Sequence, residues 1–360
     1  MGGARQLSES VTPTERDAHI EERIKALGYG LGFDLVGITT LGPAETASEF
    51  DAWLAAGYAG EMDYMARGAE ARRDSRLPRS GARTAVVVAL GYGGAEPPGP
   101  VARYARGDDY HDVMQGKLRS LHRALEELVG RPIDGKPYVD TGPILERDLA
   151  RRAGLGWFGK NTNLINPRIG SFFFLGALLL DVELEPDAPF DADRCGTCTR
   201  CIDACPTDAI TAPGVLDARA CISYLTIELR GSIPEPLREA MGTLLYGCDI
   251  CQDVCPWNVR FSDELREPAF APRSALGGMT ASALAREILT MDDDDYRASF
   301  RGSPMKRAKL RGLKRNAAVV LGNIGTTEDT DVLTHALDDP EPIVREHAAW
   351  ALRRVTSRAR

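Results

Sequence analysis

Hydrophobic and polar positions follow two different periods in the first half of the chain. Apolar residues spaced three and four apart predict amphipathic helices over residues 14–27, 112–129 and 144–153. Apolar runs bounded by turn residues predict strands over residues 34–39, 84–90 and 170–182. Helices and strands that alternate in this way indicate an α/β domain, which we expect to end near residue 185.

The end of the chain shows the helical period alone. Short helices are predicted over residues 314–322, 330–337 and 342–355, with Gly, Asp and Pro between them. This pattern is typical of a HEAT-type helical repeat, which is a binding scaffold. The cysteines all fall between these two regions. We therefore expect a three-part α+β chain, with an α/β domain over residues 1–185, a cysteine-bearing domain over 186–262 and a helical region over 263–360.

No stretch of the sequence has the length of a membrane span. The longest apolar stretch, residues 172–180, is too short to cross a bilayer as a helix. The first residues are polar and contain no apolar segment of the kind found in signal peptides. We therefore expect a cytoplasmic protein with no membrane partner.

The net charge of −8 argues against a general affinity for nucleic acid. Residues 301–315 differ from the rest, because they hold seven basic residues and no acidic one. Such a basic stretch can bind a polyanion locally, or it can be a solvated surface that pairs with nearby acids such as those at 292–295. The candidate phosphate contacts are Lys306, Arg307, Lys309, Arg311, Lys314 and Arg315.

The eight cysteines form two runs with one cysteine between them. The first run has the complete C-x₂-C-x₂-C-x₃-C-P spacing of bacterial ferredoxins, and the second lacks the first member of that spacing. Cys221 is the cysteine left over, and it can supply the missing ligand. Structural zinc and disulfides are the alternatives. Zinc sites usually pair two C-x₂-C units without the C-x₃-C-P extension, and disulfides need an oxidising compartment. The spacing therefore favours two [4Fe–4S] clusters.

The ligands of each cluster follow from how such runs fold. Three cysteines spaced two residues apart wrap one cubane, and the fourth, before the proline, reaches the other cluster. The expected ligands of the first cluster are Cys195, Cys198, Cys201 and Cys255. Those of the second cluster are Cys205, Cys221, Cys248 and Cys251.

Two further motifs have more than one interpretation. Residues 154–159 match G-x-G-x-x-G, but a helix is predicted before the glycines and none after them, which disfavours a dinucleotide site. Asp140 follows an apolar pair and precedes a Gly-Pro turn. Its carboxyl group could have a raised pKa and act as a general acid, or Asp140 could be a turn or cap residue. The five histidines lie scattered, and none has a metal-binding spacing.

The motifs in combination resemble one family, the epoxyqueuosine reductases. The segments that carry the resemblance are RYARGDDYH, PYVDTGPILERDLARRAGLGWFGKN, GSFFFLG, CGTCTRCIDACPTDAI, CISYLTIELRG and YGCDICQDVCPWN, and it spans about residues 15–355. That family reduces epoxyqueuosine to queuosine at the wobble position of tRNA anticodons. It is related to cobalamin-dependent reductive dehalogenases, which share the two-cluster arrangement.

The resemblance implies a cobalamin in the N-terminal domain, reduced to cob(I)alamin by electrons from the clusters, with Asp140 as the proton donor. The implied cobalamin contacts are Arg72 (or Arg73), Ala102, Asp140, Leu164, Leu175, Ser223, Cys248 and Asp249. No histidine lies between His122 and His335, so we expect base-off cobalamin without a histidine on cobalt. The helical region and the basic stretch would bind the tRNA anticodon, and an external electron donor, which the sequence does not identify, would reduce the clusters. We expect a monomer.

Two other functions remain open from the sequence. One is a dehalogenase-like cobalamin reductase of a small molecule, and the other is a two-cluster electron carrier that is not an enzyme. The carrier has no use for the 185 residues before the cysteines. The small-molecule reductase has no use for the helical region and the basic stretch.

Overall fold

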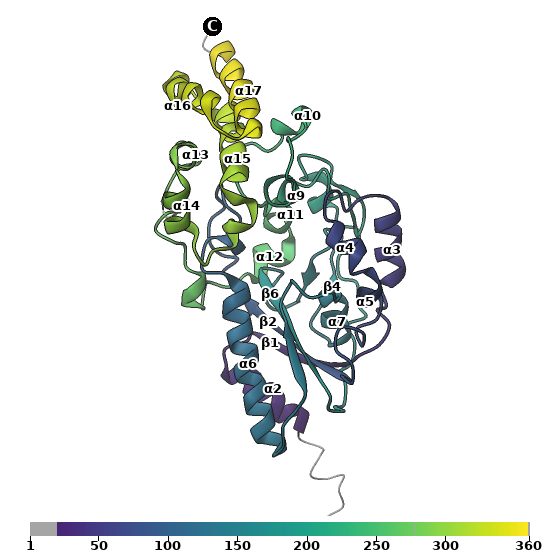
Figure 1. The fold of residues 1–360 in the computed structure, drawn as a ribbon. Coiled ribbons are helices and arrows are strands. Elements are labelled where there is room, and N and C mark those ends of the chain that lie inside the picture. Colours follow the sequence, from purple (N-terminus) through teal and green to yellow (C-terminus); the bar gives the residue numbers. More distant parts are fainter. Residues whose placement is uncertain (1–19, 277, 359–360) are drawn as a thin grey trace, which may run out of the picture.

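A four-stranded sheet forms the centre of the N-terminal half (Figure 1). The computed structural model describes residues 20–276 and 278–358. The strands run in the spatial order β1 (Leu35–Thr40), β2 (Thr84–Gly91), β6 (Phe173–Leu180) and β3 (Gly135–Tyr138). Residues 85–89 of β2 are fully buried, because helices cover both faces of the sheet. This burial explains why β2 reads as an unbroken apolar run.

Alternate residues of β2 pack into two separate cores. Val86 and Val88 face α2 (Ile20–Gly30) and α6 (Tyr110–Val129), whereas Ala85 and Val87 face α7 (Glu146–Arg152). Helix α6 begins at Asp109, whose side chain accepts a hydrogen bond from the His111 backbone, and ends at Gly130 in the left-handed conformation. These two signals place the start of α6, and with it His111, at one end of the sheet.

The predicted strands and helices of this half are present. The expected α/β domain implies parallel strands, however, and that expectation is wrong. Every pair of neighbours in the four-stranded sheet is antiparallel. In an α/β unit a crossover helix covers the sheet and makes the next strand parallel. Here the connection from β1 to β2 carries α3 (Ala47–Ala55), α4 (Asp63–Arg67) and α5 (Ala69–Arg73). These helices lie to one side, where Trp53 donates to the Leu216 carbonyl at 2.7 Å. Of the helix predicted over residues 14–27, positions 14–19 lie outside the described residues.

The glycine-rich segment leads from a helix into a hairpin. After α7 the chain forms β4 (Trp157–Phe158) and β5 (Leu164–Ile165), which pair antiparallel. A Cβ atom on Gly156 would lie 2.2 Å from the Ile165 carbonyl oxygen, so this close approach requires glycine. The motif therefore has a packing role.

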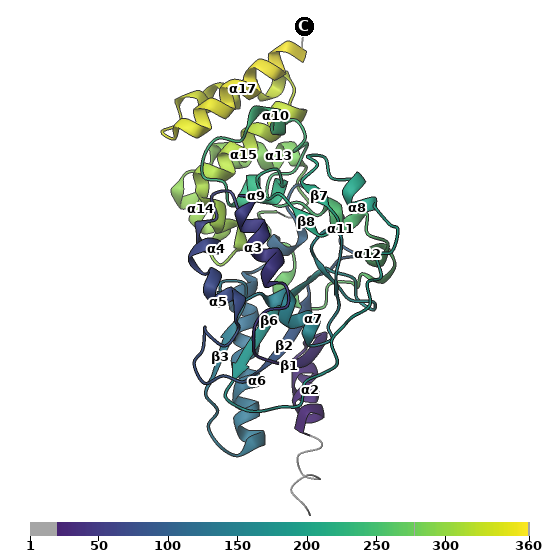
Figure 2. The same cartoon turned by 90° about the vertical axis from the view of Figure 1, so that its right-hand side faces the viewer.

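The cysteine-bearing region consists of short elements to one side of the sheet (Figure 2). Helices α8 and α11, which lie within the two cysteine runs, contact each other. The elements are α8 (Arg200–Asp203), β7 (Ile210–Ala212), β8 (Val215–Leu216), α9 (Ile222–Ile227), α10 (Glu235–Arg238), α11 (Ile250–Asp253) and α12 (Pro256–Phe261).

The C-terminal helices share one core with the segment between the two cysteine runs. Ile222, Met241 and Leu245 of that segment are buried with residues of the central helix α15. Asn316 of α15 donates to the carbonyls of Thr226 and Leu245 at 2.8 and 2.9 Å. The helices are α13 (Ala281–Thr290), α14 (Asp293–Phe300), α15 (Lys309–Ile324), α16 (Thr330–His335) and α17 (Pro342–Arg358).

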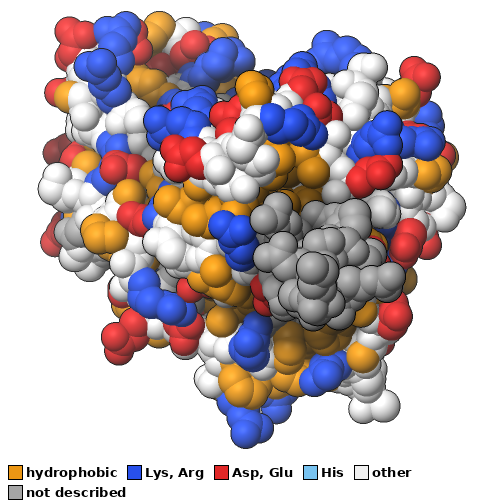
Figure 3. All heavy atoms as spheres, turned by 90° about the horizontal axis from the view of Figure 1, so that it is seen from below, with side chains coloured by type: hydrophobic (Ala, Val, Ile, Leu, Met, Phe, Trp, Pro, Cys, Tyr) orange, Lys and Arg blue, Asp and Glu red, His pale blue; other side chains and the backbone are white. Residues whose placement is uncertain are grey.

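Seen from the end that carries α2 and α6, basic and acidic side chains are mixed over the surface, with apolar side chains between them (Figure 3). Within the described residues, no helix has both the length and the apolar character needed to cross a bilayer.

Candidate active site and iron–sulfur centre

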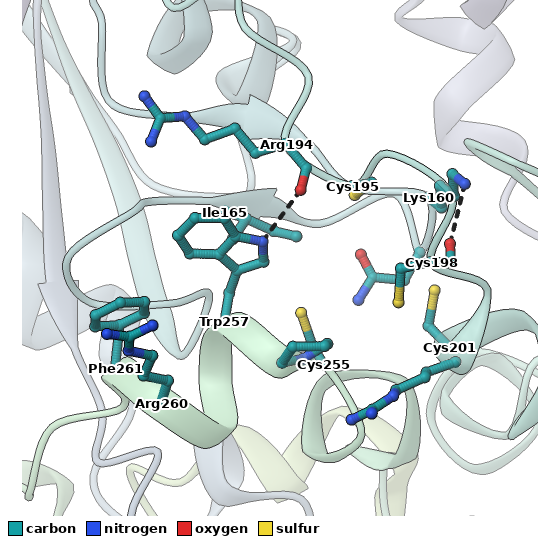
Figure 4. A pocket seen from close by; sticks show the side chains of 13 residues that line it. Lys160, Ile165, Arg194, Cys195, Cys198, Cys201, Cys255, Trp257, Arg260 and Phe261 are labelled. Atoms are coloured by element: carbon teal, nitrogen blue, oxygen red, sulfur yellow. Dashed lines mark hydrogen bonds between the residues drawn. The ribbon is translucent and has the colours of Figure 1, made fainter.

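Cys195, Cys198, Cys201 and Cys255 line one cavity of about 330 Å³. The sulfur atoms of Cys198, Cys201 and Cys255 point into the same space (Figure 4). Cys255 comes from the second run and caps α12, whose first residue is Pro256. The structure therefore brings cysteines of both runs together, and their thiols suit the ligand shell of one cubane.

The other four cysteines are neighbours as well, because their charges raise the pKa values of one another's thiols. Burial, and then the charges of Cys221 and Cys205, raise the pKa of the Cys248 thiol to about 12. Burial, followed by the charges of Cys248 and Cys221, raises the pKa of Cys251. Such effects require short distances between the groups. Cys201 also raises the pKa of Cys251, so the two sets of four adjoin. None of the eight cysteines forms a disulfide in the structure.

A second cavity, of about 200 Å³, lies beside the second cysteine set. Gln252, the residue after Cys251, forms part of its wall. Aromatic and aliphatic side chains make up much of the remaining wall, which suits the face of a flat cofactor. The apolar and aromatic residues are Tyr92, Tyr104, Tyr110, Leu164, Phe173, Phe174 and Leu175, and the charged residues are Asp140, Glu146 and Arg147.

Asp140 lies in this cavity and contacts residues at the start of α6 and at the start of α7. The Tyr110 hydroxyl donates to Asp140 Oδ2 at 2.8 Å, and His111 Nε2 lies 3.4 Å from the same oxygen. The Asp140 backbone N–H donates to Glu146 Oε1 at 2.6 Å. Asp140 has a φ of +57°, which is costly for a residue other than glycine. These hydrogen bonds hold the backbone in that conformation.

His111 is part of a chain of charged groups that reaches the basic stretch. Its Nδ1 lies 2.7 Å from Oδ1 of Asp109, a carboxylate with only 3% of its side chain exposed. The Lys306 ammonium lies 2.6 Å from the other oxygen of Asp109. Burial lowers the pKa of His111, but hydrogen bonds and charges from Asp109 and Asp140 outweigh it and raise the pKa to about 9. His111 is therefore an imidazolium at neutral pH.

The pKa of Asp140 corrects the sequence-based expectation. Burial raises this pKa, but hydrogen bonds from His111 and Tyr110 outweigh it, so the net shift is downward. The expectation of a raised pKa in an apolar setting is therefore wrong for the carboxyl group in this structure. Glu146 has the raised value instead, because burial and the charge of Asp140 raise its pKa to about 8.

Some of the residues implied as cobalamin contacts line the second cavity, and the others lie near the second cysteine set. Leu164 and Leu175 line the same cavity as Asp140. Ala102 and Asp249 are adjacent to each other, because the next residue, Arg103, donates its backbone N–H to Asp249 Oδ2 at 2.8 Å. Ser223 lies in α9, directly after Cys221 and Ile222. These positions, in the cavity wall and next to Cys221 and Cys248, suit a cofactor that lies between the sheet and the second cysteine set.

Arg72 and Arg73 occupy different environments. Arg72 is buried, and the charges of Glu146 and Asp140 act on its guanidinium, whose pKa is lowered by burial. Arg73 is half exposed and binds Asp51 at the surface. Of the two arginines, Arg72 is therefore the one that interacts electrostatically with the acids of the cavity.

The basic stretch is ordered and largely paired. It forms the 3₁₀ helix Pro304–Ala308 and the start of α15. Its acidic partners are not residues 292–295, which instead begin α14. The ion pairs are Lys306–Asp109, Arg307–Glu228, Lys314–Asp339 and, at 3.9 Å, Arg311–Glu341. Lys309 is exposed and has a φ of +60°.

Arg315 cannot contact a phosphate in this structure, which corrects the sequence-based list. Its side chain is only 1% exposed. The guanidinium donates to the carbonyls of Leu225, Leu229 and Gly231 at 2.6 to 2.8 Å. Arg315 therefore joins α15 to the segment between the cysteine runs.

Sequence reasoning missed four residues of the site: Tyr110, His111, Glu146 and Arg147. Tyr110 and His111 lie within the RGDDYH segment, and Glu146 and Arg147 open α7. An acidic residue followed three positions later by another, as Asp109 is by Asp112, is a signal for the start of a helix. This signal could have placed His111 at a helix end. Nothing in the spacing connects that helix end with Asp140, which lies 29 positions further along the chain.

Two family models match the chain. One, described as a 4Fe–4S double cluster binding domain, matches residues 194–258. The other, described as epoxyqueuosine reductase QueG (DUF1730), matches residues 72–141. The first match covers all eight cysteines, and the second includes both Arg72 and Asp140.

Relatives match over nearly the whole length. The epoxyqueuosine reductase of Pseudomonas aeruginosa is 39% identical, covering 97% of this chain and 98% of its own. That of Escherichia coli is 41% identical over 92% of this chain and 89% of its own.

Solved structures of epoxyqueuosine reductases have the same fold. A selenomethionine-labelled enzyme superposes with a TM-score of 0.84 at 31% identity, over 94% of this chain and 91% of its own. Another, solved with an epoxyqueuosine-modified tRNA-Tyr stem loop, gives 0.83 at 31% identity, over 94% and 90%.

Proposed function

Because the chain belongs to the epoxyqueuosine reductase family, we propose that it reduces epoxyqueuosine to queuosine at the wobble position of tRNA anticodons. Members of this family are oxidoreductases, so the chain is an enzyme rather than a simple electron carrier. The position of Asp140 carries the proposal: its carboxylate lies in a cavity whose wall includes the residue after Cys251. A side chain that can transfer protons thus lies close to the cysteine set that is proposed to hold the second cluster.

In this proposal the two cysteine sets hold two [4Fe–4S] clusters, and base-off cobalamin occupies the second cavity. Arg72, Ala102, Leu164, Leu175, Ser223, Cys248 and Asp249 are its proposed contacts. When bound, cobalamin supplies a strongly reducing, nucleophilic centre that the protein itself does not have. Phe173 and Phe174 form an apolar part of the wall beside that centre. All residues of the wall except Gln252 come from the proposed domain over residues 1–185.

The protein side chains supply the protons. Converting an epoxide to an alkene and water consumes two electrons and two protons. At neutral pH His111 and Glu146 hold one proton each beside Asp140, since their pKa values are raised to about 9 and about 8. We propose that Asp140 passes a proton to the epoxide oxygen and that His111, 3.4 Å away, resupplies Asp140. This role does not require Asp140 to store a proton between turnovers.

We assign the tRNA contact to the exposed part of the basic stretch and the helical region. The support is a solved relative that binds an epoxyqueuosine-modified stem loop. Lys309 and Arg311 are the best candidates, because Lys309 is exposed and the Arg311 pair with Glu341 is long at 3.9 Å. Lys306, Arg307 and Lys314 could exchange their carboxylate partners for phosphates, whereas Arg315 is excluded by its burial.

The test is turnover by protein reconstituted with iron, sulfide and cobalamin. We expect a tRNA stem loop that carries epoxyqueuosine to lose one oxygen atom, as read by mass spectrometry of the digested nucleosides. A small halogenated aromatic should not react. Reduction of the halogenated compound without reaction of the stem loop would refute the proposal in favour of a small-molecule reductase.

The cluster ligands are tested separately by paired substitutions. Cys255→Ala should damage the first cluster although it belongs to the second run, and Cys221→Ala should damage the second cluster as Cys205→Ala does. Mössbauer spectra and iron content report the loss of each cluster. A Cys221→Ala protein with full iron content would refute the assignment.

A further inference from the structure

The opening above the first cysteine set is basic. Besides four cysteines, its lining includes Lys160, Arg194, Arg200 and Arg260, and no carboxylate. The chain as a whole carries a net charge of −8, so this concentration of cations is local. We call these four cations together with Trp257 and Phe261 the first-cluster face.

These cations are not neutralised by side chains of the described residues. None of the four has a carboxylate oxygen within the 4.0 Å of an ion pair, in contrast to Lys306, Arg307 and Lys314 of the basic stretch. Lys160 donates to the carbonyls of Gly196 and Cys198. The nearest acids in sequence are engaged elsewhere: Asp193 accepts from the Cys195 backbone N–H, Asp203 accepts from Thr199, and Asp263 pairs with Arg266.

The face also includes apolar groups. Trp257 and Phe261 of α12 line the same cavity as the four cations. On the same helix, Trp257 stacks on Phe261, and Arg260 lies over the Phe261 ring. A small apolar centre with a charged rim is typical of surfaces that bind protein partners transiently.

We propose that the first-cluster face is the docking site of an acidic one-electron carrier protein. This inference rests on the proposed function and extends it to the electron donor. At each encounter the carrier is oxidised by one electron and the first cluster is reduced by one. Two encounters supply both electrons of a turnover, and the protons come from the His111 side of the active site. Because the second cysteine set adjoins the first and borders the catalytic cavity, the electrons have a continuous route.

Charge and position identify the occupant. A negative carrier surface complements the cations and accelerates encounter at low salt. A tRNA bound at the start of α15 would not block this face: in Figure 2, α8 and α12 lie on the side of the molecule away from α14. Donor and substrate can therefore be bound at the same time.

The experiment compares two charge-reversed forms of the reconstituted enzyme. The test variant is R194E/R200E/R260E, and the control is R119E/R123E/R131E, which makes the same charge change on exposed residues of α6 and the loop after it. Purified acidic flavodoxin and acidic ferredoxin are the probes. Calorimetry gives the dissociation constant of the oxidised probe over a salt series, and stopped-flow absorbance gives the rate at which the reduced probe bleaches the clusters.

We expect the test variant to bind roughly 10–100-fold more weakly, with a smaller salt dependence and slower cluster reduction, while the control matches wild type. Turnover driven by dithionite should stay within about twofold for both. Should the test variant lose iron, R260E, which changes one exposed residue of the face, replaces it; binding should weaken in the same direction and turnover driven by dithionite should stay unchanged.

Equal loss in test and control would overturn the inference, as would the absence of salt-dependent binding of either probe to wild type. Failure of the proposed function is distinguishable, because it would abolish dithionite-driven turnover in wild type without changing probe binding.

Discussion

At the scale of single residues, the proposed mechanism assigns the storage and the delivery of protons to different side chains. His111 and Glu146 hold protons at neutral pH, whereas Asp140, which reaches into the cavity, does not. The buried Asp109 carboxylate fixes the His111 ring through Nδ1 and leaves Nε2 directed toward Asp140. In that mechanism the Asp140 side chain, which is 63% exposed, needs to carry a proton only during turnover, because His111 and Glu146 hold protons beside it.

Asp140→Asn should abolish delivery without disturbing the cofactors. Asparagine keeps the shape of the side chain but cannot pass a proton as a carboxyl group does. We expect single-turnover rates on the modified stem loop to fall by about 10²–10⁴. Iron content and the cobalamin spectrum serve as controls. A rate within a few-fold of wild type would make Asp140 a turn residue only.

The proton held by His111 should appear in the pH profile. The imidazolium is present below its pKa of about 9, so turnover should fall as the pH rises through that value. In His111→Gln the rate should be low and the fall near that pH should disappear. Single-turnover rates with dithionite-reduced enzyme test this, with tRNA affinity measured in parallel. A wild-type rate that stays flat beyond pH 9 would contradict the role of His111.

At the scale of elements, α17 is attached to the rest of the molecule through a neutral histidine. His347 of α17 is fully buried. Its Nδ1 pairs with the Ile343 carbonyl at 2.6 Å, and its Nε2 accepts from the Ile233 backbone N–H at 3.2 Å. A proton on Nε2 would face that N–H donor, so the folded state requires the neutral ring.

Acid should therefore release α17. Burial, and then the charge of Arg238, lower the pKa of His347 from 6.5 to about 4. Because the folded pKa is below the unfolded one, the unfolded chain takes up the proton first, and stability is lost as the pH falls from 6.5 toward 4. The loss is at most roughly 3 kcal/mol. Hydrogen exchange of α17 over this range measures it. His347→Gln should flatten the dependence, and an unchanged slope would refute this explanation.

Helices and strands could be predicted from the sequence where a single hydrophobic period dominates a segment. The contacts between those segments could not be predicted. The strand at 84–90 and the helix at 112–129 correspond to β2 and α6, because their apolar periods reflect burial directly. Strand direction was not predictable, since it depends on where α3, α4 and α5 lie. Arg315 looked like its basic neighbours, and only the backbone carbonyls that surround it distinguish it. The cysteine grouping could be expected because the spacing itself imposes the geometry.

At the scale of the whole molecule, the proposed function brings electrons, protons and tRNA to the cavity from different parts of the chain. The cysteine region borders it at Gln252, the start of α6 supplies His111, and the basic stretch touches Asp109 through Lys306. The helical region is also continuous with the segment between Cys221 and Cys248, which shares its core. We therefore expect the tRNA-binding part to be mechanically connected with the second cluster site.

Neutralising Lys309 and Arg311 together should weaken tRNA binding. For every phosphate that the protein no longer neutralises, the slope of log affinity against log salt should become shallower by about 0.7–0.9. Reduction of the free epoxyqueuosine nucleoside should hardly change. The matched control neutralises Arg119 and Arg123, which are exposed on α6. If both double variants keep the wild-type affinity and slope, the anticodon binds elsewhere.

The crossing of the cysteine runs has a consequence for how the protein is made. The first cavity takes three cysteines from the first run and Cys255 from the second. During synthesis the first set is complete only once Cys255 has been made, and the second set only once Cys251 has been made. A message cut before Cys248 therefore yields a polypeptide with at most three cysteines of the first set and two of the second. If the two sets hold clusters as proposed, loading of iron and sulfide must wait until the ribosome has translated the second run.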